Sequence, residues 1–180
     1  MEATLQAIIK EIDGVLENVN SDGLDTAMAE IVPGRRVFVE GEGRSGLMAR
    51  GFAMRLMHLG YTVFVVGETI TPALSEADVF IGVSGSGTGP HVLVDAAKAK
   101  ERGCRVIAFT SKNDSTLAGL ADVVAVIPGT VRGDAGAERG SMQLLSSLFD
   151  QSLHIVLDAL CLKISRRDAV NNQTATGTHW

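Results

Sequence analysis

Apolar residues recur at two different spacings along this chain of 180 residues. From Leu5 to Val19 they stand three or four positions apart, which is the spacing of one face of an amphipathic α-helix. Ser21-Asp22-Gly23 interrupts that pattern, and a second, shorter helix is expected over residues 24–32, where Pro33-Gly34 ends it. The pattern therefore predicts two helices within residues 1–34.

After residue 34, short apolar runs alternate with helical patterns. The predicted strands cover residues 36–40, 62–66, 79–83, 105–109 and 123–127, and the predicted helices cover residues 47–59, 91–102, 117–120 and 142–164. This alternation is typical of a parallel sheet covered on both faces, which right-handed crossovers wind into a three-layer α/β/α sandwich of the flavodoxin or Rossmann kind. We predict a single domain over residues 1–180, with a polar tail over residues 166–180 that is mobile or lies over a neighbouring subunit.

Composition narrows the classes of function. Hydrophobic residues make up 46% of the chain and aromatic residues only 4%, as in the aliphatic interior of a parallel sheet. The formal net charge of −5 argues against binding to a nucleic-acid backbone, and no signal peptide or membrane span is evident. We therefore expect a cytoplasmic protein with no nucleic-acid or membrane partner, whose Cys104 and Cys161 are buried rather than metal ligands.

A glycine-rich and serine-rich turn separates the predicted strand 79–83 from the helix 91–102. It reads Ser-Gly-Ser-Gly-Thr-Gly over residues 84–89. Glycine lets the backbone approach a ligand closely, and the N–H groups at a helix start favour an anion. The hydroxyl groups add donors without adding charge, so the turn predicts a site for a phosphate monoester. The predicted phosphate contacts are Ser84, Gly85, Ser86, Gly87 and Thr88.

A second turn, Gly-Glu-Gly-Arg-Ser-Gly over residues 41–46, follows the first predicted strand after the amino-terminal helices. In a parallel sheet both turns lie at the carboxyl ends of strands, where ligands bind. We expect the two turns to bracket one ligand, with Ser45 as a further phosphate contact. Neither turn is a Walker loop. The second turn also fits the dinucleotide fingerprint, an alternative set aside because no acidic partner for a nucleotide is obvious.

Several segments resemble the sugar isomerase (SIS) family, and within it the 6-phospho-3-hexuloisomerases. They are Gly-Arg-Ser-Gly at 43–46, Phe-Ala-Met-Arg-Leu-Met-His-Leu-Gly at 52–60, Val-Gly-Glu-Thr-Ile-Thr-Pro-Ala at 66–73, the serine turn and Leu-Phe-Asp-Gln at 148–151. The resemblance implies a five-stranded parallel sheet, a homotetramer with active sites at subunit interfaces, and no metal or organic cofactor. The implied reaction converts D-arabino-hex-3-ulose 6-phosphate to fructose 6-phosphate in formaldehyde assimilation by the ribulose monophosphate pathway.

The chain departs from the family at two positions. Thr88 stands one residue earlier than the usual threonine, and Asp150 replaces a glutamate. Moving a carbonyl from C3 to C2 through an enediol requires one base suited to both carbons, and a partly desolvated carboxylate serves. Asp150 is the predicted base. The alternative is a solvated helix face, since Asp150 belongs to a polar stripe with Gln143, Ser147, His154 and Asp158.

His58 and three other residues complete the predicted site. His58 is expected either to assist ring opening and proton transfer or to stabilise the end of its helix. Arg55 stands three residues earlier and can face the same pocket. Arg44, Arg55 and Glu68 are the predicted sugar contacts, with surface ion pairs or a solvated loop acid as the alternatives.

Two other functions remain open at this stage. One is a different phosphosugar aldose–ketose isomerase, of the phosphoheptose type, although such relatives are longer or carry metal-binding histidines. The other is a sugar-phosphate sensor without catalysis. Sensors of this kind usually carry a DNA-binding segment, and the acidic lead of residues 1–34 does not fit one.

Overall fold

The computed structural model describes residues 1–179 and contains a five-stranded sheet in which all neighbouring strands are parallel. The strands are β1 (Val37–Gly41), β2 (Val63–Val65), β3 (Val79–Val83), β4 (Arg105–Thr110) and β5 (Val123–Val126), in the order β2-β1-β3-β4-β5. Each predicted strand is confirmed, with both ends within one residue. The order is that of the flavodoxin-like doubly wound sheet.

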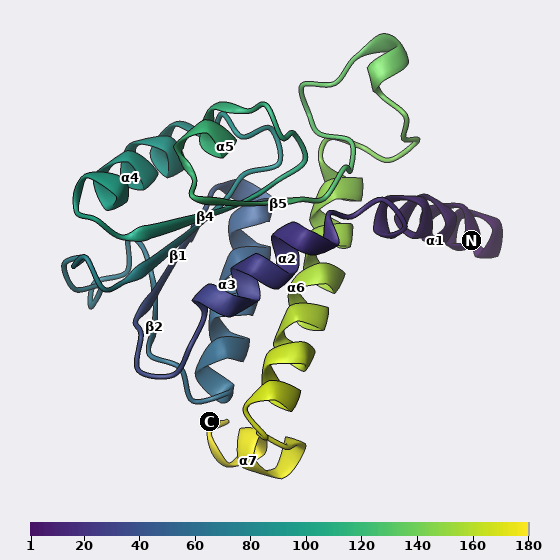
Figure 1. Cartoon of the computed structure of the whole chain (residues 1–180). Coiled ribbons are helices and arrows are strands. Elements are labelled where there is room, and N and C mark those ends of the chain that lie inside the picture. The colour runs from purple at the N-terminus through teal and green to yellow at the C-terminus, as the bar shows by residue number, and fades with distance from the viewer. Residues whose placement is uncertain (180) are drawn as a thin grey trace.

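Helices cover both faces of the sheet (Figure 1). On one face α3 (Gly43–His58) and α6 (Ser147–Arg167) lie side by side, with α2 (Ser21–Glu30) beside β5. On the other face lie α4 (Pro90–Glu101) and α5 (Thr116–Leu120). Successive strand side chains enter opposite cores, because their directions alternate along a strand. Val37 and Val39 join the α3 side and Phe38 joins the α4 side, so the three-layer prediction is confirmed.

The two amino-terminal helices are present, with one correction. The first, α1 (Glu2–Leu16), packs against α6 and extends away from the sheet (Figure 1). Ser21-Asp22-Gly23 does not interrupt the second helix but forms its first turn, because the Asn20 side chain accepts the Gly23 N–H at 2.8 Å and caps the helix. A Cβ on Gly23 would lie 2.3 Å from the Val124 carbonyl oxygen, so this glycine lets α2 approach β5 closely.

The glycine turn after β1 is shorter than predicted. Helix α3 begins at Gly43 rather than at Leu47, so Arg44 and Ser45 lie in its first turn. A Cβ on Gly46 would lie 2.3 Å from the Gly41 carbonyl oxygen. Only glycine therefore allows this helix to begin so close to the end of the strand.

The carboxyl-terminal third differs most from the prediction. Helix α6 begins at Ser147, five residues after the predicted start. Glu11 of α1 accepts hydrogen bonds from Ser141 Oγ at 2.7 Å and from the Met142 N–H at 2.8 Å. These bonds hold Ser141 and Met142 in a loop and keep them out of the helix. That loop, residues 127–146, contains the short 3-10 turn η1 (Gly136–Glu138).

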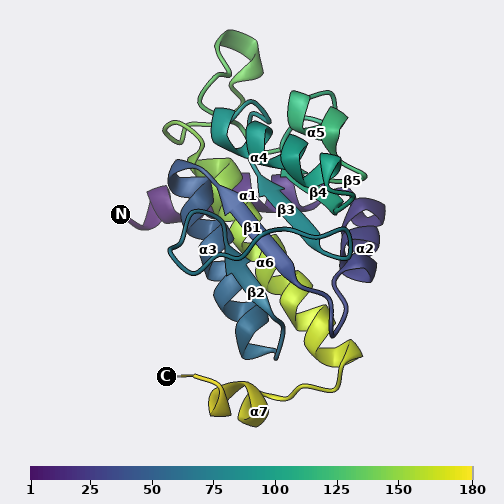
Figure 2. The same ribbon diagram turned by 90° about the vertical axis from the view of Figure 1, so that its left-hand side faces the viewer.

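The polar tail also needs correction. Helix α6 continues to Arg167, and residues 172–177 form a further helix, α7 (Asn172–Gly177), which is capped by the Asn171 side chain. Figures 1 and 2 both place α7 at the opposite end of the molecule from η1. The Thr178 hydroxyl donates to the His58 carbonyl oxygen at 3.0 Å, so this segment is attached to the end of α3. Trp180 lies outside the described residues.

The two cysteines and the hydropathy of the helices can also be compared with the predictions. Cys104 and Cys161 are both buried, as predicted, with 4% of each residue exposed. Within residues 1–179, no helix combines the length and the apolar content required to cross a bilayer.

Candidate active site

A cavity of about 650 Å³ opens where the turns after β1 and β3 meet the start of α6. It is lined by Glu42, Gly43, Arg44, Ser45, Val83, Ser84, Gly85, Ser86, Thr88, Gly89, Pro90, Arg132, Gly133, Leu145, Ser146, Ser147 and Asp150. β1 and β3 are neighbours whose crossovers run in opposite directions, so the cavity lies at the topological switch point of the sheet. The structure therefore brings the two glycine-rich turns to one space.

Asp150 is the most deeply buried charged group of this cavity. It lies in the first turn of α6 with 2% of its surface exposed, and Ser45 Oγ donates to its Oδ1 at 2.6 Å. Arg44 Nε lies 3.9 Å from Asp150 Oδ2. Burial raises the pKa of the Asp150 carboxyl, while the Ser45 hydrogen bond and the Arg44 charge oppose that shift. The solvated helix face considered for Asp150 is therefore wrong.

The hydroxyl groups of the serine turn gather on the cavity wall. Ser86 Oγ and Thr88 Oγ1 are 2.8 Å apart, and Ser84 Oγ accepts the Gly89 N–H at 3.4 Å. The two central glycines serve the backbone. A Cβ on Gly85 would lie 2.8 Å from both Phe149 and Val131, and Gly87 has a φ of +65°, a conformation that favours glycine.

The N-terminus of α4 is occupied by Glu42, which corrects the expectation of free N–H groups there. Glu42 Oε1 accepts the His91 N–H at 2.8 Å and the Val92 N–H at 3.3 Å. Pro90, the first helical residue, has no N–H to donate. The helix start therefore already binds an anion, and that anion is a side chain of the protein.

A second carboxyl group, that of Glu40, lies in β1 two residues before Glu42. Glu40 is 8% exposed, and its Oε2 has no hydrogen-bond partner among the described residues. Burial and the nearby Asp95 carboxylate raise the pKa of Glu40 to about 7. Glu40 does not line the cavity.

His58 and Arg55 lie at the other end of α3. This helix of 16 residues is roughly 24 Å long at 1.5 Å per residue. The His58 ring is buried and stacks on His179 with ring centres 5.1 Å apart, and burial lowers the pKa of its imidazole. Arg55 lines a separate hollow of about 290 Å³. Within one chain, neither residue joins Asp150.

Glu68 also lies apart from the cavity. It is exposed in the turn after β2, at the edge of the sheet, and it does not line the cavity. Glu42 and Arg132 line the cavity but were not predicted. Their positions in the sequence could have indicated a role in the site, since each follows the carboxyl end of a predicted strand in a glycine-containing segment.

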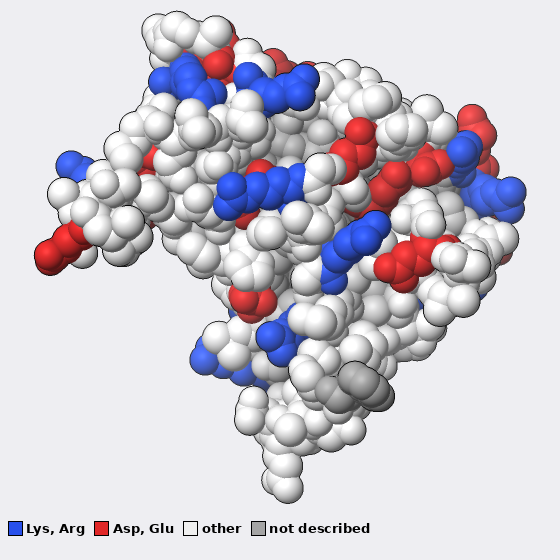
Figure 3. Space-filling model, turned by 180° about the vertical axis from the view of Figure 1, so that it is seen from behind, with Lys and Arg blue, Asp and Glu red and all other residues white. Residues whose placement is uncertain are grey.

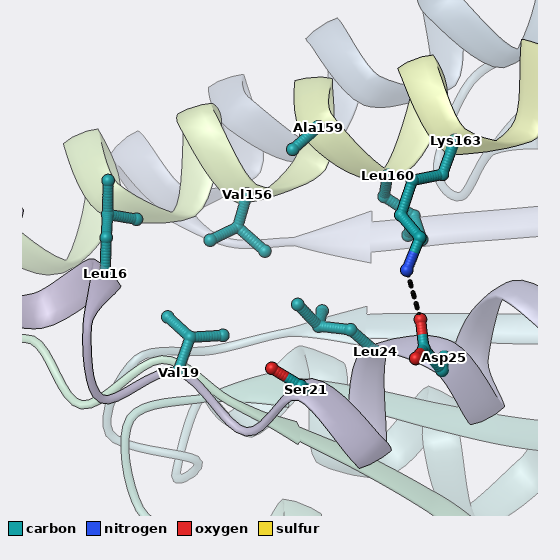
Figure 4. A pocket seen from close by; sticks show the side chains of 9 residues that line it. All are labelled: Leu16, Val19, Ser21, Leu24, Asp25, Val156, Ala159, Leu160 and Lys163. Atoms are coloured by element: carbon teal, nitrogen blue, oxygen red, sulfur yellow. Dashed lines mark hydrogen bonds and ion pairs between the residues drawn. The ribbon is translucent and has the colours of Figure 1, made fainter.

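A smaller hollow of about 210 Å³ lies between α6 and the segment that joins α1 to α2. Figure 4 shows aliphatic side chains on both of its sides, among them Leu16, Leu24 and Val156, and an ion pair between Lys163 and Asp25 at its edge. A phosphorylated sugar requires more hydrogen-bonding groups than this wall offers. The polar cavity is therefore the better candidate for the active site.

Surface charge does not point to a polyanionic ligand. On the face that Figure 3 shows, Lys and Arg side chains alternate with Asp and Glu. Together with the net charge of −5, this distribution favours a small anion that is held locally.

Comparison with known proteins gives consistent matches. Residues 30–137 match the profile of the SIS domain. A 3-hexulose-6-phosphate isomerase of Mycobacterium gastri is 44% identical over 87% of this chain and 78% of that protein. Its namesake from Bacillus subtilis is 34% identical over 96% of this chain and 93% of that protein. A similar fold is found in the crystal structure of a hypothetical protein from Methanococcus jannaschii, for which the function of a 3-hexulose-6-phosphate isomerase is inferred. The match has a TM-score of 0.82 and 28% sequence identity, and it covers 99% of this chain and 98% of that chain.

Proposed function

This chain belongs to the SIS domain family, and we propose that it is an isomerase that interconverts D-arabino-hex-3-ulose 6-phosphate and fructose 6-phosphate. The class of sugar-phosphate isomerases is supported by the relatives of that name. The observation that carries the proposal is the Asp150 carboxylate, which is buried in a cavity whose wall also holds the hydroxyl groups of the serine turn. A sensor that only binds a sugar phosphate would not need a buried base.

The proposed reaction moves one proton between neighbouring carbons. The Asp150 carboxylate removes the proton from C2, the electrons of that C–H bond form the C2–C3 double bond, and the C3 oxygen gains a proton. The resulting enediol collapses when Asp150 returns a proton to C3 and the C2 hydroxyl loses its proton. One carboxyl group thus serves both carbons, which are adjacent in the substrate.

Neighbouring groups set the properties of that base. The Ser45 hydroxyl holds Asp150 Oδ1 at 2.6 Å, which fixes the direction of the carboxylate. Arg44 brings a positive charge to 3.9 Å from Oδ2 and can also stabilise negative charge that develops on the enediol oxygens. Ser84, Ser86 and Thr88 are proposed to hold the phosphate, away from the reacting carbons.

Three further features belong to the proposal, two of which come from the resemblance, whereas the cytoplasmic location comes from the sequence pattern. They are a homotetramer with sites at subunit interfaces, a cytoplasmic location and a role in formaldehyde assimilation by the ribulose monophosphate pathway. If the sites are shared, the end of α3 that carries Arg55 and His58 lies beside the cavity of a neighbouring copy. Light scattering tests the first feature, because a monodisperse, active monomer would contradict it.

The direct test is an assay with enzymatically made hexulose 6-phosphate in which the formation of fructose 6-phosphate is followed. Sedoheptulose 7-phosphate and arabinose 5-phosphate are the comparison substrates for aldose–ketose isomerases. We expect turnover of the hexulose phosphate, and full activity after exhaustive chelation. Turnover of a comparison substrate alone would replace the proposed reaction, and phosphosugar binding without any turnover would favour the sensor.

A further inference from the structure

Two cationic side chains line the cavity, and they differ in what they already bind. Arg44 donates to Ser147 Oγ at 3.0 Å and lies beside the Asp150 carboxylate. Arg132 is exposed at the cavity wall, and its guanidinium makes no hydrogen bond or ion pair with any residue in 1–179. Arg132 is therefore the cation that an incoming anion can bind without displacing an existing partner.

The backbone around Arg132 is fixed although its side chain is free. The Arg132 N–H donates to Ser146 Oγ at 3.0 Å, and the Val131 N–H donates to Asp134 Oδ2 at 2.9 Å. Asp134 is in turn bound by Lys112, with Nζ 2.7 Å from Oδ1. These bonds tie the turn to α6 and to the segment after β4. The position of Arg132 at the cavity is thus set before a ligand arrives.

The start of α4 is the competing place for a phosphate, and Glu42 blocks it. Its carboxylate already accepts two of the N–H groups there, at 2.8 and 3.3 Å. A dianion at the same place would meet a like charge and would have to displace those bonds. The phosphate is therefore directed away from the helix start and toward the hydroxyl groups and the free guanidinium.

We propose that Arg132 is a phosphate-binding residue, which clamps the substrate phosphate together with the hydroxyl groups of Ser84 and Ser86. The inference rests on the proposed function and deepens it, because it names the cation that neutralises the substrate. A guanidinium binds two phosphate oxygens at once through parallel N–H donors, which an ammonium group cannot do. Replacement by lysine should therefore restore only part of the affinity.

Calorimetric titration with fructose 6-phosphate and with inorganic phosphate tests this assignment. The variants are Arg132→Ala and Arg132→Lys, with Arg102→Ala as the matched control, since Arg102 is an exposed arginine at the far end of α4. We expect Arg132→Ala to weaken both ligands by about tenfold or more, the size of one lost charge-assisted hydrogen bond, and Arg132→Lys to lie between it and the wild type. Arg102→Ala should bind like the wild type, and melting curves check that all variants fold.

The kinetic readout separates binding from chemistry. Arg132→Ala should raise KM at least about tenfold and change kcat far less, because the phosphate is remote from the reacting carbons. The assignment is overturned if Arg132→Ala binds both ligands as the wild type does, or if kcat falls while binding is unchanged. Failure of the proposed reaction is a separate result, because a wild type that binds but does not turn over hexulose 6-phosphate still allows the titrations to decide on Arg132.

Discussion

The two ends of α3 carry polar side chains that serve different parts of the molecule. At its start, Ser45 and Arg44 meet the Asp150 carboxylate at the cavity beyond the carboxyl ends of β1 and β3. At its end, His58 is buried beneath the segment that contains α7 and stacks on His179. The two segments of α3 that carry the resemblance therefore do not form one site within one chain. Within a single chain, the groups suited to catalysis therefore lie at the start of α3.

The largest expected effect concerns the start of α3 and its partner Asp150. Asp150→Asn keeps the size of the side chain but removes its basicity, so kcat should fall by roughly 10²–10⁴-fold, the usual share of general acid–base catalysis. Binding of the phosphate should survive, so KM should change much less. The matched control is Asp158→Asn, because Asp158 is an exposed carboxylate on the same helix. Equal rates in the two variants would remove Asp150 from the mechanism.

The next effect concerns the affinity of the same cavity for phosphate. Each hydroxyl bond to a charged oxygen contributes roughly 1.5–3 kcal/mol, so the double variant Ser84→Ala/Ser86→Ala should bind fructose 6-phosphate at least about tenfold more weakly. Ser165→Ala is the control, since its hydroxyl donates only to a carbonyl of its own helix. A folded double variant with unchanged affinity would show that the phosphate lies elsewhere.

A smaller effect tests whether the far end of α3 takes part through a neighbouring copy. We expect His58→Ala to lower kcat by about tenfold, less than the roughly 10²-fold or more that a proton-transferring group usually contributes. If the sites are shared between subunits, oligomers co-assembled from Asp150→Asn and His58→Ala chains should be more active than either variant alone. If the activity of the co-assembled oligomers is only the sum of the two variants' activities, the role of His58 is limited to holding α7 in place.

The smallest expected effect is on stability. Because burial raises the pKa of Asp150 in the folded protein, the folded state takes up this proton more readily than the unfolded chain. Raising the pH through that range therefore costs stability. Asp150→Asn should melt a few degrees higher than the wild type at neutral pH, and the difference should shrink as the pH falls below the raised pKa. A wild type that melts higher than the variant at neutral pH would contradict this account.

The strands and layers could be predicted from the sequence because each buried strand is a local run of apolar residues. The starts of α3 and α6 could not, since contacts with distant residues set them. Glu11 holds Met142 in a loop from across the molecule, and Gly46 lets α3 begin against Gly41. The helical pattern alone could not decide whether Asp150 is buried, because a polar stripe on a helix has the same spacing whether it faces water or a cavity.

Exchange of carbon-bound hydrogen with solvent tests the central claim most directly. Fructose 6-phosphate is incubated in D₂O with the wild type, Asp150→Asn and Asp158→Asn, and deuterium is located by nuclear magnetic resonance. The account predicts deuterium at C3 with the wild type and with Asp158→Asn, and almost none with Asp150→Asn. Exchange at C1 in place of C3 would indicate an aldose–ketose isomerase, and undiminished exchange at C3 with Asp150→Asn would contradict the role of Asp150 as the base.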